Sequence, residues 1–259
     1  MPYVALDTAT QSLTIAVGER GMLLGEASTY VSKNHSVKLM PLLESLLASL
    51  DVTPDQLQGI IVGRGPGSYT GVRIAVTAAK ALAFALGIPL LGVSSLDAIA
   101  YQGQVGDALV VPMIDARRKQ AYTAFYETQN GLFVKLTEDR LETVDSIVKQ
   151  VQSRMVVRRL DKSKPAQVLF LGDGAQNHRE ELVERLGEKA RFASFGQDVT
   201  RAAFLLEVGI PRIEAGESDD PHTLEPEYLQ LHEAEQKWLA QQRQAQATES
   251  AQASPGSEG

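Results

Sequence analysis

A glycine-rich stretch carries the clearest sign of chemistry in this sequence. Residues 65–71, Gly-Pro-Gly-Ser-Tyr-Thr-Gly, lie between a short apolar run and a predicted helix over residues 72–86. At such a junction the free N–H groups and the helix dipole favour an anion. A tight turn that packs the helix on a sheet explains the glycines equally well, because neither a Walker loop nor the dinucleotide fingerprint is matched. The candidate phosphate contacts in this stretch are Gly65, Gly67, Ser68, Thr70 and Gly71.

Asp7 is a second candidate, because it follows the first apolar run, Val4-Ala5-Leu6. An acid at this place handles magnesium through water in sugar-kinase-like and actin-like proteins, and glycine is usual in the turn beside it. Thr8 and Ala9 occupy that turn here. A carboxylate that caps a hairpin turn is therefore at least an equal interpretation.

Two motifs in the second half of the chain lie at similar junctions. Asp115-Ala116-Arg117-Arg118-Lys119 falls at a predicted hairpin and could turn phosphate-binding groups toward a cleft between domains. A solvated β-turn explains it more simply. Gly172 and Gly174 lie between a strand and a helix, where they could pack on an adenosine or form a tight turn with a helix cap.

Composition and residue spacing exclude several classes of site. The chain has 259 residues and no cysteine, so a disulfide scaffold, a thiolate zinc site and a cysteine nucleophile are excluded. No histidine pair has an i, i+4 spacing, so we expect no metal site. The histidines are His35, His178, His222 and His232.

Charge and hydropathy limit the partners. With 32 acidic and 25 basic side chains the net charge is −7, which argues against nucleic acid as an unaided partner. Five basic residues lie in residues 154–164, where we expect a solvated loop. No apolar run approaches the ~18 residues of a membrane span. The first seven residues lack the features of a secretory signal, so we expect a soluble, cytoplasmic protein.

The order of predicted elements is repeated along the chain. A three-strand meander over residues 4–30 is followed by a helix at 36–50, a strand at 59–63, the helix at 72–86 and a strand at 89–93. The same order follows from residue 109. The second set comprises strands at 109–115, 121–127, 132–136 and 168–171, with helices at 144–151 and 179–186. One more helix is expected at 199–213, so the fold class is α/β with two lobes.

The helices at 36–50 and 72–86 are unusually apolar. Leucines recur at helical spacing in the first, although Pro41 must lie near its start or bend it. In the second, the polar side chains form one narrow stripe. These helices present more apolar surface than one sheet can cover, which indicates a partner interface.

Several of these motifs together resemble the bacterial TsaB family, formerly called YeaZ. The resemblance is strong over residues 1–100 and looser at 115–122 and 172–175. The motifs that carry it are Leu6-Asp7-Thr8-Ala9, His35-Ser36, Leu39-Met40-Pro41-Leu42-Leu43, Gly65-Pro66-Gly67-Ser68-Tyr69-Thr70-Gly71-Val72-Arg73, Ala81-Leu82-Ala83 and Gly87-Ile88-Pro89.

The resemblance implies an actin-like, Hsp70-like two-lobed (ASKHA) fold with a reduced second lobe. It also implies a role in forming N6-threonylcarbamoyladenosine beside the anticodon of tRNAs that read codons beginning with A. In that pathway TsaD carries the transferase site, TsaB binds and supports TsaD, and the ATPase TsaE joins them. A second TsaB takes the same helical interface when TsaD is absent. The contact residues we expect are Leu39, Leu43, Leu46, Val76, Ala79, Lys80 and Ala83.

The departures from TsaD favour a non-catalytic partner. Ser95 and Ile99 fall where TsaD has the two histidines that hold its metal. A catalytic metal site keeps about three protein ligands, so we expect no catalytic residues and no cofactor. The alternative is an ATP-binding enzyme with its own site between the lobes, formed by Asp7 and the two glycine motifs. Any tRNA contact would be made through the complex, with residues 154–164 as the candidate.

We expect four segments along the chain. Residues 1–103 form an N-terminal lobe with the partner-binding helices, and residues 104–198 form a C-terminal lobe. Residues 199–240 contain a returning helix and a C-terminal segment. From Gln241 the sequence consists mainly of Gln, Ala, Ser, Glu and Gly, which predicts a disordered tail over 241–259.

Overall fold

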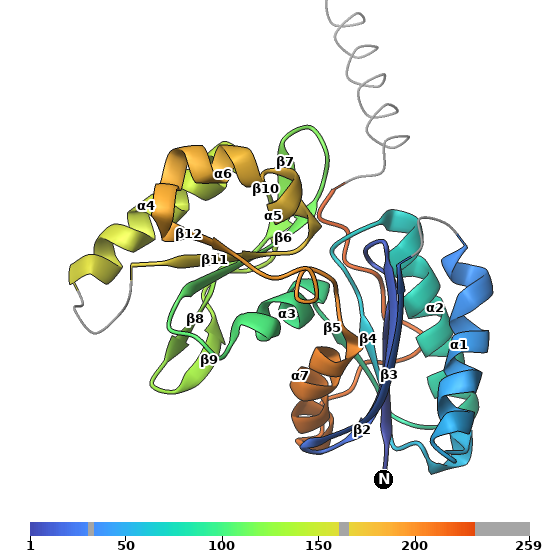
Figure 1. Cartoon of the computed structure of the whole chain (residues 1–259). Helices are drawn as coiled ribbons and strands as arrows, with labels where there is room; N and C mark the ends of the chain where they lie inside the picture. Colours follow the sequence, from blue (N-terminus) through green and yellow to red (C-terminus); the bar gives the residue numbers. More distant parts are fainter. Residues whose placement is uncertain (31–33, 161–165, 231–259) are drawn as a thin grey trace, which may run out of the picture. The chain divides into compact units, whose positions relative to one another are not determined.

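The computed structural model describes residues 1–30, 34–160 and 166–230. Residues 1–229 form one compact unit that contains two β-sheets with helices on their faces (Figure 1). The first sheet lies within residues 1–103 and the second within 104–198. The expected tail over 241–259 lies outside the described residues.

The first sheet has the strand order β3-β2-β1-β4-β5. An antiparallel meander supplies β1, β2 and β3, and the two later strands lie parallel to β1. The expected meander is thus confirmed. The strands are β1 (Tyr3–Asp7), β2 (Ser12–Glu19), β3 (Met22–Tyr30), β4 (Ile60–Gly63) and β5 (Leu90–Val93).

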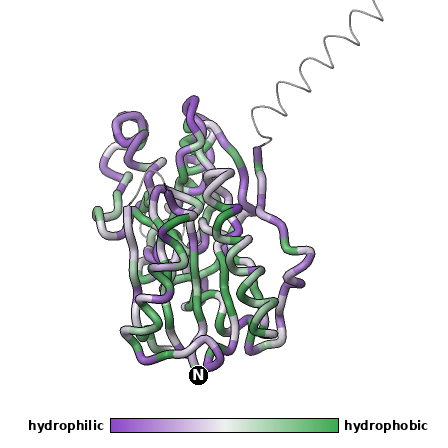
Figure 2. The backbone as a smooth tube through the Cα atoms, turned by 90° about the vertical axis from the view of Figure 1, so that its right-hand side faces the viewer, coloured by the Kyte–Doolittle hydropathy of each residue, from purple (hydrophilic) through white to green (hydrophobic). Residues whose placement is uncertain are grey.

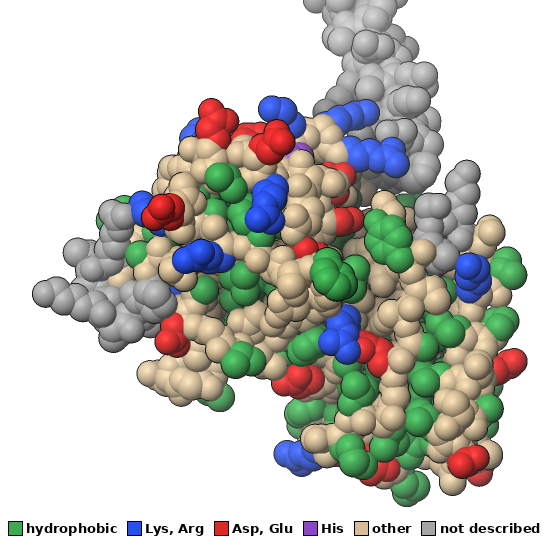
Figure 3. All heavy atoms as spheres, in the orientation of Figure 1, with side chains coloured by type: hydrophobic (Ala, Val, Ile, Leu, Met, Phe, Trp, Pro, Cys, Tyr) green, Lys and Arg blue, Asp and Glu red, His purple; other side chains and the backbone are tan. Residues whose placement is uncertain are grey.

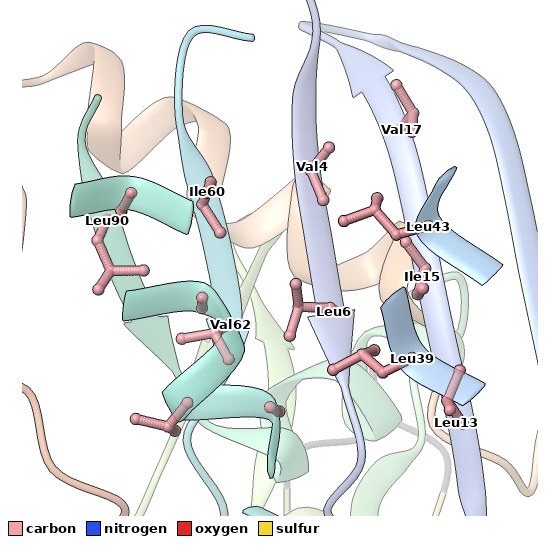
Figure 4. Packing of buried hydrophobic residues seen from close by; sticks show 14 of the residues in the cluster. Val4, Leu6, Leu13, Ile15, Val17, Leu39, Leu43, Ile60, Val62 and Leu90 are labelled. Atoms are coloured by element: carbon pink, nitrogen blue, oxygen red, sulfur yellow. The ribbon is translucent and has the colours of Figure 1, made fainter. Parts of the chain in front are cut away.

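The two faces of this sheet are covered by different helices. Alternate residues of β1 point to opposite faces: Val4 and Leu6 pack with α1 (His35–Ser49) and α2 (Tyr69–Leu86), as Figure 4 shows for α1. Ala5 packs on the other face with α7 (Ala202–Glu214).

The second sheet repeats the strand order of the first. Its order is β10-β7-β6-β11-β12, again an antiparallel meander followed by two parallel strands. A hairpin of β8 (Tyr126–Gln129) and β9 (Leu132–Lys135) pairs with β6. The main strands are β6 (Leu109–Asp115), β7 (Gln120–Thr123), β10 (Arg140–Thr143), β11 (Val168–Leu171) and β12 (Ala190–Phe192).

Each repeat supplies one helix to the sheet of the other repeat. The second sheet carries α4 (Val144–Leu160), α5 (Asp173–Asn177) and α6 (Arg179–Leu186) on one face. Its other face packs on α3 (Ser95–Ala100), which follows the first repeat, whereas α7 follows the second repeat and packs on the first sheet. The duplicated order confirms the α/β, actin-like fold class.

Three details differ from the sequence-based expectations. The strand expected at 121–127 is split between β7 and β8, because Ala124 and Phe125 lie between them, outside both strands. The expected loop at 154–164 is wrong up to residue 160, since α4 continues that far. The helix expected at 36–50 begins one residue earlier, at His35, with Asn34 as its N-cap, and Pro41 lies inside it.

The apolar character of α2 also bears on the membrane question. Among the described helices, α2 is long and apolar enough to cross a membrane by length and composition. A core helix of a globular protein meets the same criterion, and Val72, Ala75, Val76 and Ala79 of α2 are buried in the core with the first sheet.

Candidate partner-docking surface

The glycine-rich stretch lies directly against the turn that follows β1. The Ser68 N–H donates to the Ala9 carbonyl oxygen over 2.7 Å, and the Thr8 hydroxyl donates to the Gly71 carbonyl oxygen over 2.6 Å. A methyl group added at Gly71 would lie 2.0 Å from the backbone carbonyl oxygen of Thr8. One added at Gly67 would lie 2.3 Å from the backbone carbonyl oxygen of Ala9. Close backbone packing therefore accounts for these glycines.

Gly65 and Ser68 of the stretch also have structural roles. The Gly65 carbonyl accepts from the Ser95 N–H over 2.8 Å, which ties the loop to α3. The Ser68 hydroxyl accepts from the Gly71 N–H over 3.3 Å and caps α2. Thr70 is exposed in the first turn of α2.

Asp7 is enclosed at the end of β1. One carboxylate oxygen accepts from the Ala9 N–H over 2.7 Å, and the other accepts from the Ser95 hydroxyl over 2.5 Å. The side chain is fully buried, and a methyl group at Gly63 would lie 1.7 Å from it. Burial raises the pKa of Asp7 to about 6, although both hydrogen bonds act in the opposite direction. A carboxylate enclosed in this way has no exposed oxygen for a hydrated magnesium ion.

The second glycine motif is packed in a similar way. Gly172 has a φ of +93°, and a methyl group there would lie 2.4 Å from the Met113 carbonyl oxygen in β6. Gly174 also lies near that strand, since its methyl group would be 3.0 Å from the Asp115 nitrogen. The Asp173 carboxylate accepts from the Asp115 N–H over 3.0 Å. Both glycine motifs therefore join helices closely to strands.

The structure places most of the expected interface residues in the core. Six of them are buried between the helices and the first sheet, namely Leu39, Leu43, Leu46, Val76, Ala79 and Ala83. Lys80 is half-buried, and its ammonium donates to the carbonyl oxygens of His222 and Leu224. The leucine spacing that predicts a helix marks the side that faces the sheet. The side chains that remain accessible on these helices are those on the side that faces away from the sheet.

That outer side is hollowed between α1 and α2. The open groove has a volume of about 780 Å³, and Figure 2 looks onto this side of the molecule. Half-buried Met40, Ile74 and Leu82 give it an apolar floor. In the sequence, these three residues form a second apolar stripe on their helices, beside the residues that face the sheet. The lining residues are Ser36, Met40, Tyr69, Thr70, Arg73, Ile74, Thr77, Ala78, Ala81 and Leu82.

An aromatic cluster borders this groove at the start of α2. The Tyr69 ring stacks on Tyr228 with 4.7 Å between ring centroids. The Arg73 guanidinium donates to the Tyr69 hydroxyl over 2.7 Å and lies over its ring. Aromatic and arginine side chains are enriched at protein–protein interfaces.

Comparison with known proteins identifies the family. A family model described as TsaD, tRNA N6-adenosine threonylcarbamoyltransferase, matches residues 27–238. The tRNA threonylcarbamoyladenosine biosynthesis protein TsaB of Bacillus subtilis is 40% identical over 245 residues, which cover 94% of this chain and 100% of that protein. The chain belongs to the TsaB family.

Further TsaB relatives agree with this assignment. TsaB of Escherichia coli is 32% identical over 137 residues, which cover 51% of this chain and 58% of that protein. The solved structure of YeaZ from Pseudomonas aeruginosa matches with a TM-score of 0.68 and 28% identity, over 88% of this chain and 99% of that one.

On α3, Ser95 and Ile99 occupy the two positions at which we expect the metal-binding histidines of TsaD. Ser95 is bound to Asp7, and Ile99 is buried against the second sheet. Among the described residues, no group of three or more His, Asp and Glu side chains is arranged to hold a metal ion.

Proposed function

We propose that this TsaB family member is a non-catalytic partner of TsaD. The chain takes part in tRNA threonylcarbamoyladenosine biosynthesis, as its family does. In the proposed role it binds TsaD in the cytoplasm and holds it in its active form. TsaD then forms N6-threonylcarbamoyladenosine at the adenosine beside the anticodon of tRNAs that read codons beginning with A, and TsaE joins the complex.

The groove between α1 and α2 is the observation that supports this proposal. Its apolar floor and the cluster of Tyr69 and Arg73 have the composition of a protein-docking surface. We assign this groove to TsaD, and to a second copy of the chain when TsaD is absent. The enclosed Asp7 carboxylate favours a supporting role over catalysis by this chain.

Substitution in the groove tests the proposal. Ala81 is exposed in the groove, whereas Ala85 is exposed one turn further along α2, outside the groove lining. Ala81→Glu would place a charge against the apolar floor. We expect the affinity for TsaD, followed by co-elution, to fall at least ~10-fold. The substitution should also lower tRNA modification in a mixture with TsaD, TsaE and a threonylcarbamoyl-adenylate source.

Ala85→Glu is the matched control and should behave as the wild type in both measurements. Modification that proceeds without this chain, together with no co-elution, would overturn the proposed function. Equal loss in the two variants would place the contact elsewhere on α2.

The alternative function is that of an ATP-binding enzyme with its own site between the lobes. It would use Asp7, the Gly65–Gly71 stretch and the Gly172–Ala175 motif. Calorimetric titration with magnesium-ATP separates the two, since binding tighter than ~1 mM that is lost in Asp7→Asn would favour the enzyme.

A further inference from the structure

The turn between β6 and β7 holds three basic residues in an unfavourable backbone conformation. The φ angles of Arg117, Arg118 and Lys119 are +63°, +51° and +57°. Residues other than glycine, asparagine and aspartate rarely adopt this left-handed region, because Cβ then lies too close to the following carbonyl oxygen. Among the described residues, no other run of three non-glycine residues has positive φ angles.

The hydrogen bonds of the turn show why the strain persists. The Gln120 N–H donates to the Arg117 carbonyl oxygen over 2.9 Å, so Arg118 and Lys119 are the two central residues of a tight hairpin turn. Two positive φ angles in these positions are typical of the type I′ turn, which favours Asn-Gly. The Val144 N–H also donates to the Lys119 carbonyl oxygen over 3.0 Å, which fixes the turn to the start of α4.

The side chains of this turn are exposed and positively charged. All three residues are exposed, in a chain whose net charge is −7. Glu181 forms an ion pair with the turn, and its carboxylate lies 3.6 Å from the Lys119 ammonium. The Lys119 side chain is 79% exposed, so this pair leaves it accessible. Figure 3 shows Lys and Arg side chains along the upper border of the molecule, with Asp and Glu side chains among them, and Figure 1 places the turn between β6 and β7 near this border.

The other basic stretch of this lobe is not available in the same way. Arg158 is buried, pairs with Glu127 and donates to the Asp107 carbonyl oxygen. The Arg154 guanidinium lies over the Phe125 ring. Residues 161–165 lie outside the described part of the chain. Of the five basic residues at 154–164, the structure thus describes the side chains of two, and both are engaged within the lobe.

We propose that Arg117, Arg118 and Lys119 form a phosphate-binding turn that contacts the tRNA backbone in the complex with TsaD. A strained conformation that costs stability, and that carries only basic side chains, is explained by a function that needs those charges in a fixed place. Phosphate contacts of this kind position a nucleic acid without reading its sequence. The inference rests on the proposed function, because the acidic chain meets tRNA only in that complex.

Two double variants separate charge from strain. Arg118→Asn with Lys119→Gly removes two charges and supplies the residues that the turn favours, so we expect the Tm of the chain to rise by about 2–6 °C. Arg118→Gln with Lys119→Gln removes the same charges and keeps the strain, so its Tm should not rise. Both should weaken binding of labelled tRNA by the TsaD complex several-fold, and reduce the slope of log K against log[salt] by about 2.

The control removes two exposed charges at other places. Arg20→Gln with Arg191→Gln should leave tRNA affinity and its salt dependence unchanged. Unchanged affinity in both turn variants, with co-elution with TsaD intact, would overturn this inference alone. An equal loss of tRNA affinity in the control would also overturn the inference, because basic residues anywhere on the surface would then contribute as much as those of the turn. Failure of the wild-type chain to co-elute with TsaD would overturn the proposed function as well. Binding of ATP by the chain alone that is lost in the glutamine variant would reassign the turn to a nucleotide.

Discussion

The Asp7 carboxyl group shows how a residue with the appearance of a catalytic acid can be part of the core. It occupies the end of β1, where an acid can serve a nucleotide, but its oxygens are bound to Ala9 and Ser95. The sequence placed this residue correctly at the end of a strand. It left open whether the carboxylate faces a cleft, because that depends on how closely Gly63 and α3 approach it.

The raised pKa of Asp7 predicts a pH dependence of stability. The pKa is about 6 in the folded chain, against 3.8 for an unperturbed aspartate, so folding favours the protonated form. This stabilisation is complete below pH ~4 and is lost as the pH rises through ~6, a change on the order of 3 kcal/mol. Asp7→Asn should remove this component, and its Tm relative to the wild type should rise between pH 5 and pH 8. Exposed Asp55→Asn is the control, and parallel curves for Asp7→Asn and wild type would contradict the prediction.

Gly71 gives a second prediction for a single position. Gly71→Ala would place a methyl group 2.0 Å from the Thr8 carbonyl oxygen, so the turn after β1 must shift away from α2. We expect a loss of about 2–4 kcal/mol in the free energy of unfolding, measured with urea. Gly196→Ala is the matched control, because nothing lies within 4 Å of that position. Equal stability of the two variants would show that the turn is free to move.

The helices and strands were largely predictable, and the docking surface was not. Apolar periodicity located α1 and α2, and alternation located β2, because a packed core imposes these repeats on the sequence. The same periodicity marked Leu43 and Val76 as interface residues, although they face the sheet. A sequence does not show which of two apolar stripes on a helix meets its own sheet. The short strands β10 and β12 lack a strong pattern and were missed for that reason.

Lys80 on α2 holds the segment that follows α7. Its ammonium donates to the carbonyl oxygens of His222 and Leu224 over 3.3 and 2.8 Å. We expect Lys80→Met to cost about 1–2 kcal/mol and to speed limited proteolysis within residues 217–229. Lys149→Met is the control, since its ion pair with Asp145 is exposed. Unchanged cleavage would show that the buried Leu224 side chain is sufficient to hold the segment.

The molecule as a whole is joined by polar contacts that cross between its two repeats. The Tyr126 hydroxyl and the Lys135 ammonium, both from the β8–β9 hairpin, bind the Asp97 carboxylate on α3 over 2.6 and 2.9 Å. Lys135 also lies 2.7 Å from the Asp139 carboxylate, whose side chain is 4% exposed. Burial and the Asp97 charge raise the pKa of Tyr126 well above its ordinary value, which keeps the hydroxyl a donor.

Removing the Lys135 charge should therefore affect both repeats. Lys135→Met leaves Asp139 without its cation, and we expect a loss of about 3 kcal/mol. Because α3 and α7 are exchanged between the sheets, β4 and β11 should lose amide protection together. Hydrogen exchange followed by mass spectrometry checks this in wild type and variant. Protection lost from only one sheet would show that the repeats unfold independently.

The exchange of helices also sets the order in which the protein can be completed during synthesis. The strands of the first sheet all lie before residue 94, and α1 and α2 can cover one face as soon as they leave the ribosome. The other face must wait for α7, which ends at Glu214. Throughout the synthesis of the second repeat, the nascent chain therefore presents the apolar side chains of Ala5, Ile61 and Leu91 on an open sheet. The first part of the chain to be made is thus the last to be closed.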